Sequence, residues 1–480
     1  MHCKYETIIG LEVHVQLSTK TKQFCSCSVE FGKEPNSQVC PVCLGLPGVL
    51  PVLNEKSLQY SIKIALALKC KIQKIMKFDR KNYYYPDLPK AYQISQYDMP
   101  LAYNGKVTIV CDDEKGTKKD IGVTRAHMEE DAGKLLHDPN KSYSYVDLNR
   151  VGTALLEIVS EPEIETPDQA YKYLTNLKQI IKYLEVSDCN MEEGSLRCDA
   201  NISLRERGEK KLGNKVEIKN LNSFKAVRDS LLFEENRQRE ILEEGGIIKQ
   251  ETRLWDEKKN VTTSMRSKED TQDYRYFPEP DLVPFEIKDE LIQEIRKNMP
   301  ELPEGKAERF AKDYNLDNKD IQILISDKSI ACFYEEVVKI FKDYKIVCNW
   351  IKGEILKHMN EKNLSINKLN ITPQYLASII KMVQNNTISG LASKQVLAEC
   401  IETGIDPVVI VKNNSLEQLS DEKELEKIIL KVIKENEKSV IDYKKGKVNA
   451  LGFLIGQVMK QTKGKANPKV VNEMFRKELD

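Results

Sequence analysis

The alternation of apolar and polar residues predicts a β-strand over residues 8–17. Leu11 and Val13 fall on one face of this strand, while Glu12 and His14 fall on the other. A half-buried antiparallel strand with one wet face produces the same pattern. Glu12 and His14 therefore indicate a functional site only in combination with other segments of the chain.

Two further segments supply that combination. Residues 154–159 form an apolar run with Glu157 at its centre, and a carboxylate among apolar neighbours is unfavourable unless it is paired or binds a metal ion. Residues 127–134 add Glu130 within a run of acids, although an exposed acidic turn explains that run equally well. Carboxylates and an imidazole gathered from these segments predict a Mg²⁺ site, whose shell a substrate phosphate completes.

The N-terminal part of the chain has the pattern of an α+β fold. Residues 1–290 alternate strand-like runs with turns rich in Gly, Pro and Asn. Helices are predicted over residues 168–183 and 224–244, and the second ends at two glycines. We therefore expect an α+β domain that is built on a largely antiparallel sheet and carries few helices.

The rest of the chain has a helical pattern, in which amphipathic segments rich in Lys and Glu dominate. Two small all-helical domains are expected, over residues 291–405 and 406–480, because Gly404 and Pro407 bracket a strong helix stop. The helices are expected over residues 317–326, 329–344, 372–384, 390–403, 425–436, 448–462 and 470–479.

Composition excludes several classes of protein. Lys and Arg together number 74, as do Asp and Glu, so no global field attracts nucleic acid and any RNA contact must use a local patch. No apolar run reaches the roughly 18 residues of a membrane span, and residues 1–6 do not begin a signal peptide. We expect a cytoplasmic protein without a membrane partner.

Four of the twelve cysteines form two close pairs, Cys25 with Cys27 and Cys40 with Cys43. Two such pairs on neighbouring turns match the needs of a tetrahedral Zn²⁺ site, and four thiolates leave that site closed and structural. The one-residue spacing of the first pair is the less common one. Free buried thiols are the alternative.

A lysine patch lies near the C-terminus. Between Tyr443 and Asn472 there are lysines and no acidic residue. Such a patch suits contact with a phosphate backbone, and the alternative is a solvated helix face. The seven lysines are Lys444, Lys445, Lys447, Lys460, Lys463, Lys465 and Lys469.

Common nucleotide-binding and hydrolase motifs are missing from the sequence. It contains no Gly-x-x-x-x-Gly-Lys-Ser/Thr loop and no Gly-x-Gly-x-x-Gly loop, which argues against a P-loop ATPase and a Rossmann cofactor site. It also lacks the Gly-x-Ser-x-Gly elbow of many hydrolases.

Six long motifs lie at residues 10–15, 78–83, 127–133, 191–201, 273–281 and 452–457. Through these motifs the chain resembles, over its whole length, the B subunits of tRNA-dependent amidotransferases of the GatCAB type. The resemblance implies that residues 1–290 form a cradle-like catalytic domain.

The resemblance implies a glutamine-hydrolysing carbon–nitrogen ligase. Such a subunit uses ATP and Mg²⁺ to phosphorylate the side-chain carboxylate of Glu on tRNA(Gln) or Asp on tRNA(Asn). Ammonia from the amidase (A) subunit then gives the amide, and a small C subunit completes the heterotrimer. By position, Glu12, His14, Glu130 and Glu157 match the metal and activation site of the family. Some family members hold zinc in a Cys quartet and others lack it.

Two other hypotheses stay open. A non-catalytic, zinc-stabilised tRNA-binding module would explain the lysines and the four cysteines, but it leaves Glu157 in an apolar strand unexplained. A stand-alone carboxylate–amine ligase would need its own ammonia source, and no glutaminase nucleophile motif is visible, so a partner subunit is the better explanation.

Overall fold

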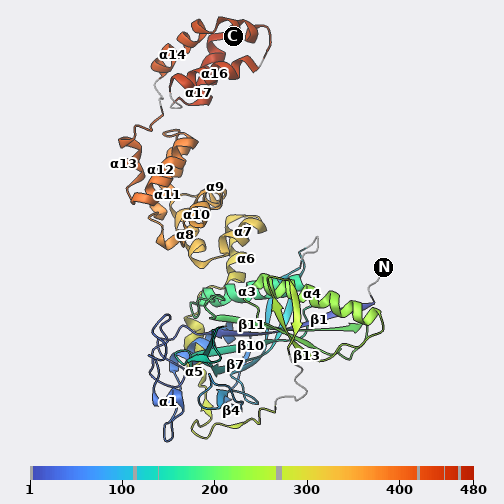
Figure 1. Cartoon of the computed structure of the whole chain (residues 1–480). Helices are drawn as coiled ribbons and strands as arrows, with labels where there is room; N and C mark the ends of the chain where they lie inside the picture. Colours follow the sequence, from blue (N-terminus) through green and yellow to red (C-terminus); the bar gives the residue numbers. More distant parts are fainter. Residues whose placement is uncertain are drawn as a thin grey trace. The chain divides into compact units, whose positions relative to one another are not determined.

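The computed structural model of the chain consists of two compact units, Met1–Pro303 and Glu304–Asp480 (Figure 1). Within them the structure describes residues 4–111, 116–138, 140–265, 273–418, 422–447, 449–462 and 466–479.

A large mixed sheet forms the centre of the first unit. In the described residues it has nine strands in the order β14-β13-β12-β11-β1-β10-β7-β6-β2. All neighbours are antiparallel except β12 and β13, which are parallel, so the expected α+β class is confirmed while the sheet is not purely antiparallel. In chain order the strands are β1 (Tyr5–Gln16), β2 (Lys71–Ile72), β6 (Ala102–Val110), β7 (Lys118–Glu130), β10 (Ala154–Ser160), β11 (Leu196–Glu206), β12 (Val216–Lys219), β13 (Glu251–Asp256) and β14 (Val261–Ser264).

Short strand pairs surround this sheet. A three-stranded sheet has the order β15-β4-β5, β16 pairs with β3, and β8 pairs with β9. Their bounds are β3 (Ile75–Met76), β4 (Asp79–Asn82), β5 (Tyr92–Ser95), β8 (Lys134–His137), β9 (Ser144–Asp147), β15 (Phe277–Pro278) and β16 (Phe285–Glu286).

Two helices, α3 (Pro167–Leu184) and α4 (Phe224–Glu243), pack against each other and on the central sheet (Figure 1). Leu11 and Val13 of β1 lie in the same buried cluster as Leu177 of α3. The alternation along β1 therefore places its apolar side chains in the core and its polar side chains on the opposite face, as the sequence predicts.

Local sequence explains where these two helices begin and end. Thr166 caps α3 by accepting a hydrogen bond from the Gln169 amide, and Ser223 caps α4 in the same way through Ala226. At the end of α4, Gly245 adopts a φ of 80°, and the amide of Gly246 bonds back to the carbonyl of Ile241. Both predicted helices are confirmed. The unit also contains α1 (Pro41–Leu44), α2 (Glu55–Ala67) and α5 (Asp289–Lys297).

The second unit is helical in its described residues. It contains two clusters of buried hydrophobic residues, one drawn from residues 310–411 and the other from residues 425–479. The predicted segment 329–344 contains one helix and the start of the next, because the chain is extended at Phe341. The elements are α6 (Pro303–Tyr314), α7 (Asn318–Ile325), α8 (Lys328–Ile340), α9 (Tyr344–Trp350), η1 (Ile351–Ile355), α10 (Leu356–Lys362), η2 (Ile366–Lys368), α11 (Pro373–Gln384), α12 (Gly390–Thr403), α13 (Pro407–Asn413), α14 (Glu422–Glu435), α15 (Glu437–Lys444), α16 (Asn449–Gln461) and α17 (Pro468–Leu479).

At both predicted domain boundaries, the residues just after the boundary pack with the hydrophobic cluster that precedes it. Ile295 of α5 belongs to the core of the first unit, beyond the expected boundary at residue 290. Ile410 and Val411 of α13 pack with the first helical cluster, beyond Gly404, which ends α12 with a φ of 71°. The described helices include none that is both long and apolar enough to cross a membrane.

Candidate functional site

Strand register gathers histidines and carboxylates on the face of the central sheet opposite the core. His14 of β1 pairs with Glu157 of β10, and Glu157 pairs with His127 of β7. Residues that pair across antiparallel strands share a face. Glu129 lies two residues after His127 on the same strand and projects to the same side. Three adjacent strands thus supply this histidine–carboxylate group, which consists of His14, His127, Glu129 and Glu157.

The group is tightly connected. Glu157 Oε2 lies 3.3 Å from His14 Nε2 and 3.2 Å from His127 Nε2. His14 Nε2 is also 3.4 Å from Glu129 Oε1. The side chains of His127 and Glu129 are almost completely buried, whereas 21% of the His14 side chain is exposed. His14 is therefore the member through which a ligand can reach the group.

Electrostatic interactions favour the charged forms of His14 and Glu157. Burial lowers the pKa of His14, but its hydrogen bond to Glu157 and the charges of Glu157 and Glu129 outweigh burial and raise that pKa to about 9. Burial raises the pKa of Glu157, but His127 and His14 outweigh it and hold the pKa well below its usual value. A carboxylate kept ionised in a buried position is available to a cation.

Three members of the group fit a small divalent cation. Ligand atoms of His14, Glu129 and Glu157 all lie within 4.8 Å of one another. Carboxylate oxygens are the preferred protein ligands of Mg²⁺, which usually keeps several positions for water and substrate phosphate. The donor set and its spacing could hold such an ion while one side of it stays open to substrate.

Glu12 lies beside this set. It occupies the same face of β1 as His14, two residues earlier along the strand. Its Oε1 accepts a hydrogen bond of 3.0 Å from Asn201 Nδ2, and burial followed by the charge of Glu157 raises its pKa. The structure thus places Glu12 next to the group, outside the three residues whose ligand atoms converge.

Glu130 lies elsewhere. Alternation along β7 directs it away from its neighbour Glu129, and it pairs with Lys90 and accepts a 3.0 Å hydrogen bond from the Ile94 amide. These contacts lie beside a cavity of about 280 Å³ that Lys90 and Glu130 line together with Cys25. The structure does not bring Glu130 to His14 and Glu157. An exposed acidic turn is excluded as well, because residues 129–131 are buried.

Sequence reasoning did not single out Glu129 and His127, although the pattern contained a signal for both. Ala126 and Met128 are apolar and fully buried, so a strand through this segment must place His127 and Glu129 together on its other face. The acid that accompanies His14 and Glu157 is therefore the first of the two consecutive glutamates.

Lys81 of β4 adds a cation close to the acids. Its Nζ lies 4.9 Å from the centre of the Tyr274 ring and 5.7 Å from that of the Tyr83 ring. Burial lowers the pKa of Lys81, but the negative charges of Glu129 and Glu157 contribute to a net rise. Lys81 therefore stays charged, and aromatic rings confine it beside the histidine–carboxylate group.

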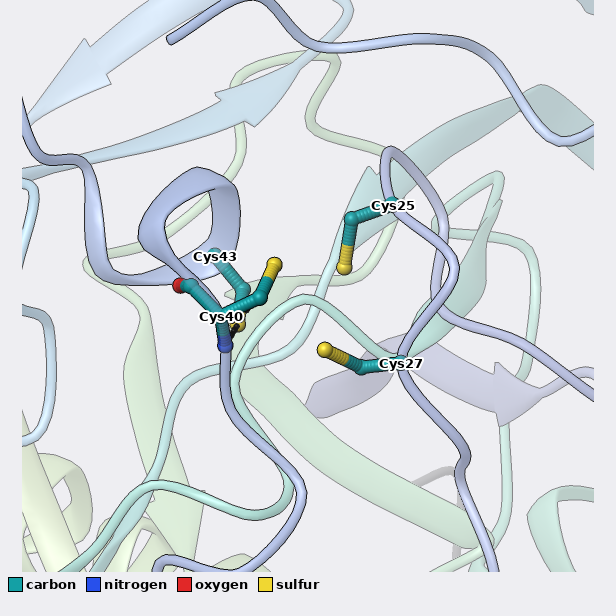
Figure 2. A group of neighbouring side chains, drawn as sticks. All are labelled: Cys25, Cys27, Cys40 and Cys43. Atoms are coloured by element: carbon teal, nitrogen blue, oxygen red, sulfur yellow. Dashed lines mark hydrogen bonds between the residues drawn. The ribbon is translucent and has the colours of Figure 1, made fainter.

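The four predicted cysteines converge at a second position. Figure 2 shows the side chains of Cys25 and Cys27 directed toward those of Cys40 and Cys43. Their sulfur atoms all lie within 4.8 Å of one another, and Sγ of Cys40 and Sγ of Cys43 are 3.9 Å apart. Sulfur atoms around tetrahedral Zn²⁺ are about 3.8 Å apart for bonds of about 2.3 Å. The quartet therefore fits Zn²⁺ with little rearrangement.

The surroundings of Cys43 favour its thiolate, whereas burial is the largest cause that raises the pKa of Cys27, to about 11. Nζ of the fully buried Lys22 donates to Cys43 Sγ at 3.6 Å, and the Cys40 amide donates to the same sulfur at 3.2 Å. The hydrogen bond from Cys25 is the largest cause that lowers the pKa of Cys43, to about 4, while burial opposes it. A buried ammonium beside four sulfurs is readily explained by a cluster that carries negative charge.

The lysine patch is surface-exposed where the structure describes it. Its described members are Lys444, Lys445, Lys447, Lys460 and Lys469, all of which are exposed.

Two predicted members of the patch, Lys463 and Lys465, lie outside the described residues. Lys447 pairs with Asp442 at 3.0 Å, so part of its charge is balanced. The other described lysines are exposed on or next to the ends of α15, α16 and α17.

Comparison with known proteins defines the class. Residues 7–293 match the family model described as the GatB/GatE catalytic domain, and residues 332–479 match the model described as the GatB domain. The first match contains the central sheet except for the first two residues of β1, together with both side-chain clusters. The chain belongs to the GatB/GatE family.

Curated relatives point to one branch of this family. A protein of Caldanaerobacter subterraneus subsp. tengcongensis and one of Thermoanaerobacter pseudethanolicus are each 55% identical to the chain over 476 residues, which is 99% of both chains compared. A Persephonella marina protein is 51% identical over 477 residues, 99% of this chain and all of that protein. Each is named as the B subunit of an aspartyl/glutamyl-tRNA(Asn/Gln) amidotransferase. The resemblance inferred from the motifs is confirmed.

Proposed function

We propose that this chain is the carboxylate-activating subunit of a tRNA-dependent amidotransferase. Its substrate is Glu attached to tRNA(Gln), Asp attached to tRNA(Asn), or both. ATP phosphorylates the side-chain carboxylate, and ammonia then attacks the activated carbonyl carbon and releases phosphate. The product is the amide on the same tRNA, which makes the reaction that of a carbon–nitrogen ligase.

The observation that carries this proposal is the convergence of His14, Glu129 and Glu157 from three adjacent strands. A rigid sheet holds such a group in place more firmly than loops do. Bound Mg²⁺ would supply positive charge to the phosphate oxygens. His127 orients Glu157 through its 3.2 Å contact, and Lys81 brings a second positive charge to the same face, where transferred phosphate carries negative charge.

Two other features have supporting roles in the proposal. Zn²⁺ bound by Cys25, Cys27, Cys40 and Cys43 stabilises the fold beside the sheet, because binding at a closed thiolate site contributes folding free energy. The lysine patch holds the tRNA backbone through phosphate contacts.

The reaction also needs partner subunits. The relatives are named as subunits, and the absence of a glutaminase nucleophile motif from this sequence leaves the source of ammonia to another chain. We therefore place an amidase (A) subunit and a small C subunit beside this chain. A zinc-stabilised subunit that only binds tRNA is the alternative, and it offers no reason for an ionised Glu157 between two imidazoles.

ATP turnover by the purified chain with its partner subunits tests the proposal. We expect ADP release to depend on Glu-tRNA(Gln) or Asp-tRNA(Asn) and to match the amide formed. The correctly charged Gln-tRNA(Gln), which has no free side-chain carboxylate, is the matched control. ATP turnover that does not respond to misacylated tRNA would leave the tRNA-binding alternative as the better explanation.

A further inference from the structure

The ladder between β1 and β10 ends beside the histidine–carboxylate group. Glu12 and Val159 are its last paired residues, and a register shift follows between Val159 and Ser160 in the pairing with β7. There the hydroxyl oxygen of Ser160 accepts a 2.9 Å hydrogen bond from the Leu11 amide. Irregularities of this kind bend a strand and are frequent next to active sites.

A hollow lies on the polar face of the sheet beside this irregularity, before the chain pairs with β1 again at Ile9 and Ile164. Its volume is about 180 Å³, and its walls include Ile8, Val159 and Pro162. Pockets for a whole drug-sized ligand have roughly 300–1,000 Å³. The hollow is therefore sized for one ring system of a larger substrate, and its apolar walls suit the two faces of a flat ring.

Gly10 of β1 forms part of the wall of this hollow. A Cβ atom added at Gly10 would meet no other atom within 4 Å, so packing does not demand glycine here. Glycine inside a strand lowers stability and often marks close approach of a ligand. The missing side chain keeps the hollow open.

Asn201 provides polar recognition. Its Nδ2 donates to Glu12 at 3.0 Å, which assigns the other side-chain atom, Oδ1, as an acceptor. Oδ1 is buried and has no hydrogen-bond partner among the described residues, and Asn201 lines the hollow. A buried acceptor without a partner is unfavourable, and an exocyclic amino group on a bound ring would satisfy it. Lys215 adds a positive charge to the lining.

We propose that this hollow is an adenosine subsite. The inference rests on the proposed function, in which both substrates carry adenosine: ATP, and tRNA through its 3′-terminal nucleotide. Four residues along β1, about 13 Å, separate Gly10 from His14. A substrate whose reacting group lies at His14 and Glu157 can therefore extend over Glu12 and place its base against Gly10 and Asn201.

A graded series at Gly10 tests the subsite in the assembled complex. Gly10→Ala, Gly10→Val and Gly10→Leu fill the hollow progressively, and valine is well accepted in strands. Calorimetry with a non-hydrolysable ATP analogue measures the affinity for nucleotide. The KM for misacylated tRNA measures the effect on the tRNA substrate. We expect Gly10→Val to weaken one of these at least tenfold while the melting temperature stays within about 2 °C.

Two further comparisons sharpen the test. GTP has a hydrogen-bond acceptor where ATP has its amino group. If the hollow binds the base of ATP, a GTP analogue should bind at least tenfold more weakly than the ATP analogue, and Asn201→Leu should reduce that difference. Lys215→Ala should weaken binding of the same substrate that Gly10→Val affects. Lys211→Ala, which changes an exposed lysine of the same loop, should not.

The outcomes separate this inference from the proposed function. An effect confined to the ATP analogue assigns the hollow to the nucleotide, and one confined to tRNA assigns it to the terminal adenosine. If Gly10→Val changes neither, the inference is wrong even when the wild-type complex makes amide. If the wild-type complex binds the analogue in a Gly10-dependent manner but makes no amide, the subsite stands and the proposed function fails.

Discussion

His14 and Glu157 face each other directly across β1 and β10, with Nε2 and Oε2 3.3 Å apart. His127 approaches the same carboxylate oxygen from β7, so that Glu157 lies between two imidazoles. The carboxylate is nearly buried and yet ionised, an arrangement that is costly unless a cation or a proton-bearing partner is always present.

Glu157→Gln preserves shape and removes the charge. We expect tRNA-dependent ATP hydrolysis and amide formation to fall about a hundredfold or more, by analogy with other positioned electrostatic groups. Binding of tRNA and the glutaminase activity of the partner subunit should be nearly unchanged, because Glu157→Gln leaves the lysine patch and the partner subunit intact. A variant that makes the amide at near wild-type rate would reduce the group to a structural cluster.

Glu129 and Glu130 are neighbours in the chain, yet they face opposite sides of β7. We expect Glu129→Gln to weaken Mn²⁺ binding, measured by calorimetry as a stand-in for Mg²⁺, at least tenfold. Glu130→Gln should alter ion affinity much less. Instead it should lower thermal stability, because it leaves the buried Lys90 without its ionic partner. Equal losses of ion affinity would show that both acids serve one ion.

The raised pKa of His14 predicts a pH-dependent ion affinity. With a pKa of about 9, the imidazole carries a proton at pH 7 that a bound ion must displace. Mn²⁺ affinity should therefore rise between pH 7 and 9 and level off above that range. Calorimetry in two buffers of different ionisation enthalpy should find release of about one proton at pH 7. His14→Gln should abolish the release, and proton-neutral binding in the wild type would contradict the prediction.

The cysteine quartet predicts one Zn²⁺ per chain. Cys40→Ser should remove the ion and lower the melting temperature by about 5 °C or more, because zinc binding contributes folding free energy. Cys332→Ser, an exposed cysteine outside the quartet, should change neither zinc content nor stability. Elemental analysis of freshly purified, reduced protein checks the prediction, and an absence of zinc there would contradict it.

The lysine patch predicts salt-dependent tRNA binding. Replacing Lys444, Lys445 and Lys460 by Gln should weaken binding and reduce the slope of log affinity against log salt by about 0.7–0.9 for each phosphate that the variant no longer neutralises. The same change at Lys427, Lys431 and Lys434 of α14, which are exposed but lie outside the patch, is the matched control. An unchanged slope in the patch variant would identify a solvated helix face.

Much of the local structure followed from the sequence. The two faces of β1, the capped starts of α3 and α4, and the glycine stops after α4 and α12 all depend on residues close together in the chain. The cysteine quartet belongs to the same group, since its two pairs lie within one short segment. Period, capping and glycine conformation are local properties, and a single sequence states them directly.

Tertiary structure decided what depends on distant partners. Strand alternation has a period of two, so a choice between Glu129 and Glu130 is a choice between opposite faces, and the pairing of β7 with β10 settles which face meets His14. The parallel pairing of β12 with β13 depends in the same way on contacts remote in sequence. So does the hollow at Gly10, because its walls come from residues as far apart in the chain as Gly10, Val159 and Asn201, and no local pattern records that they meet.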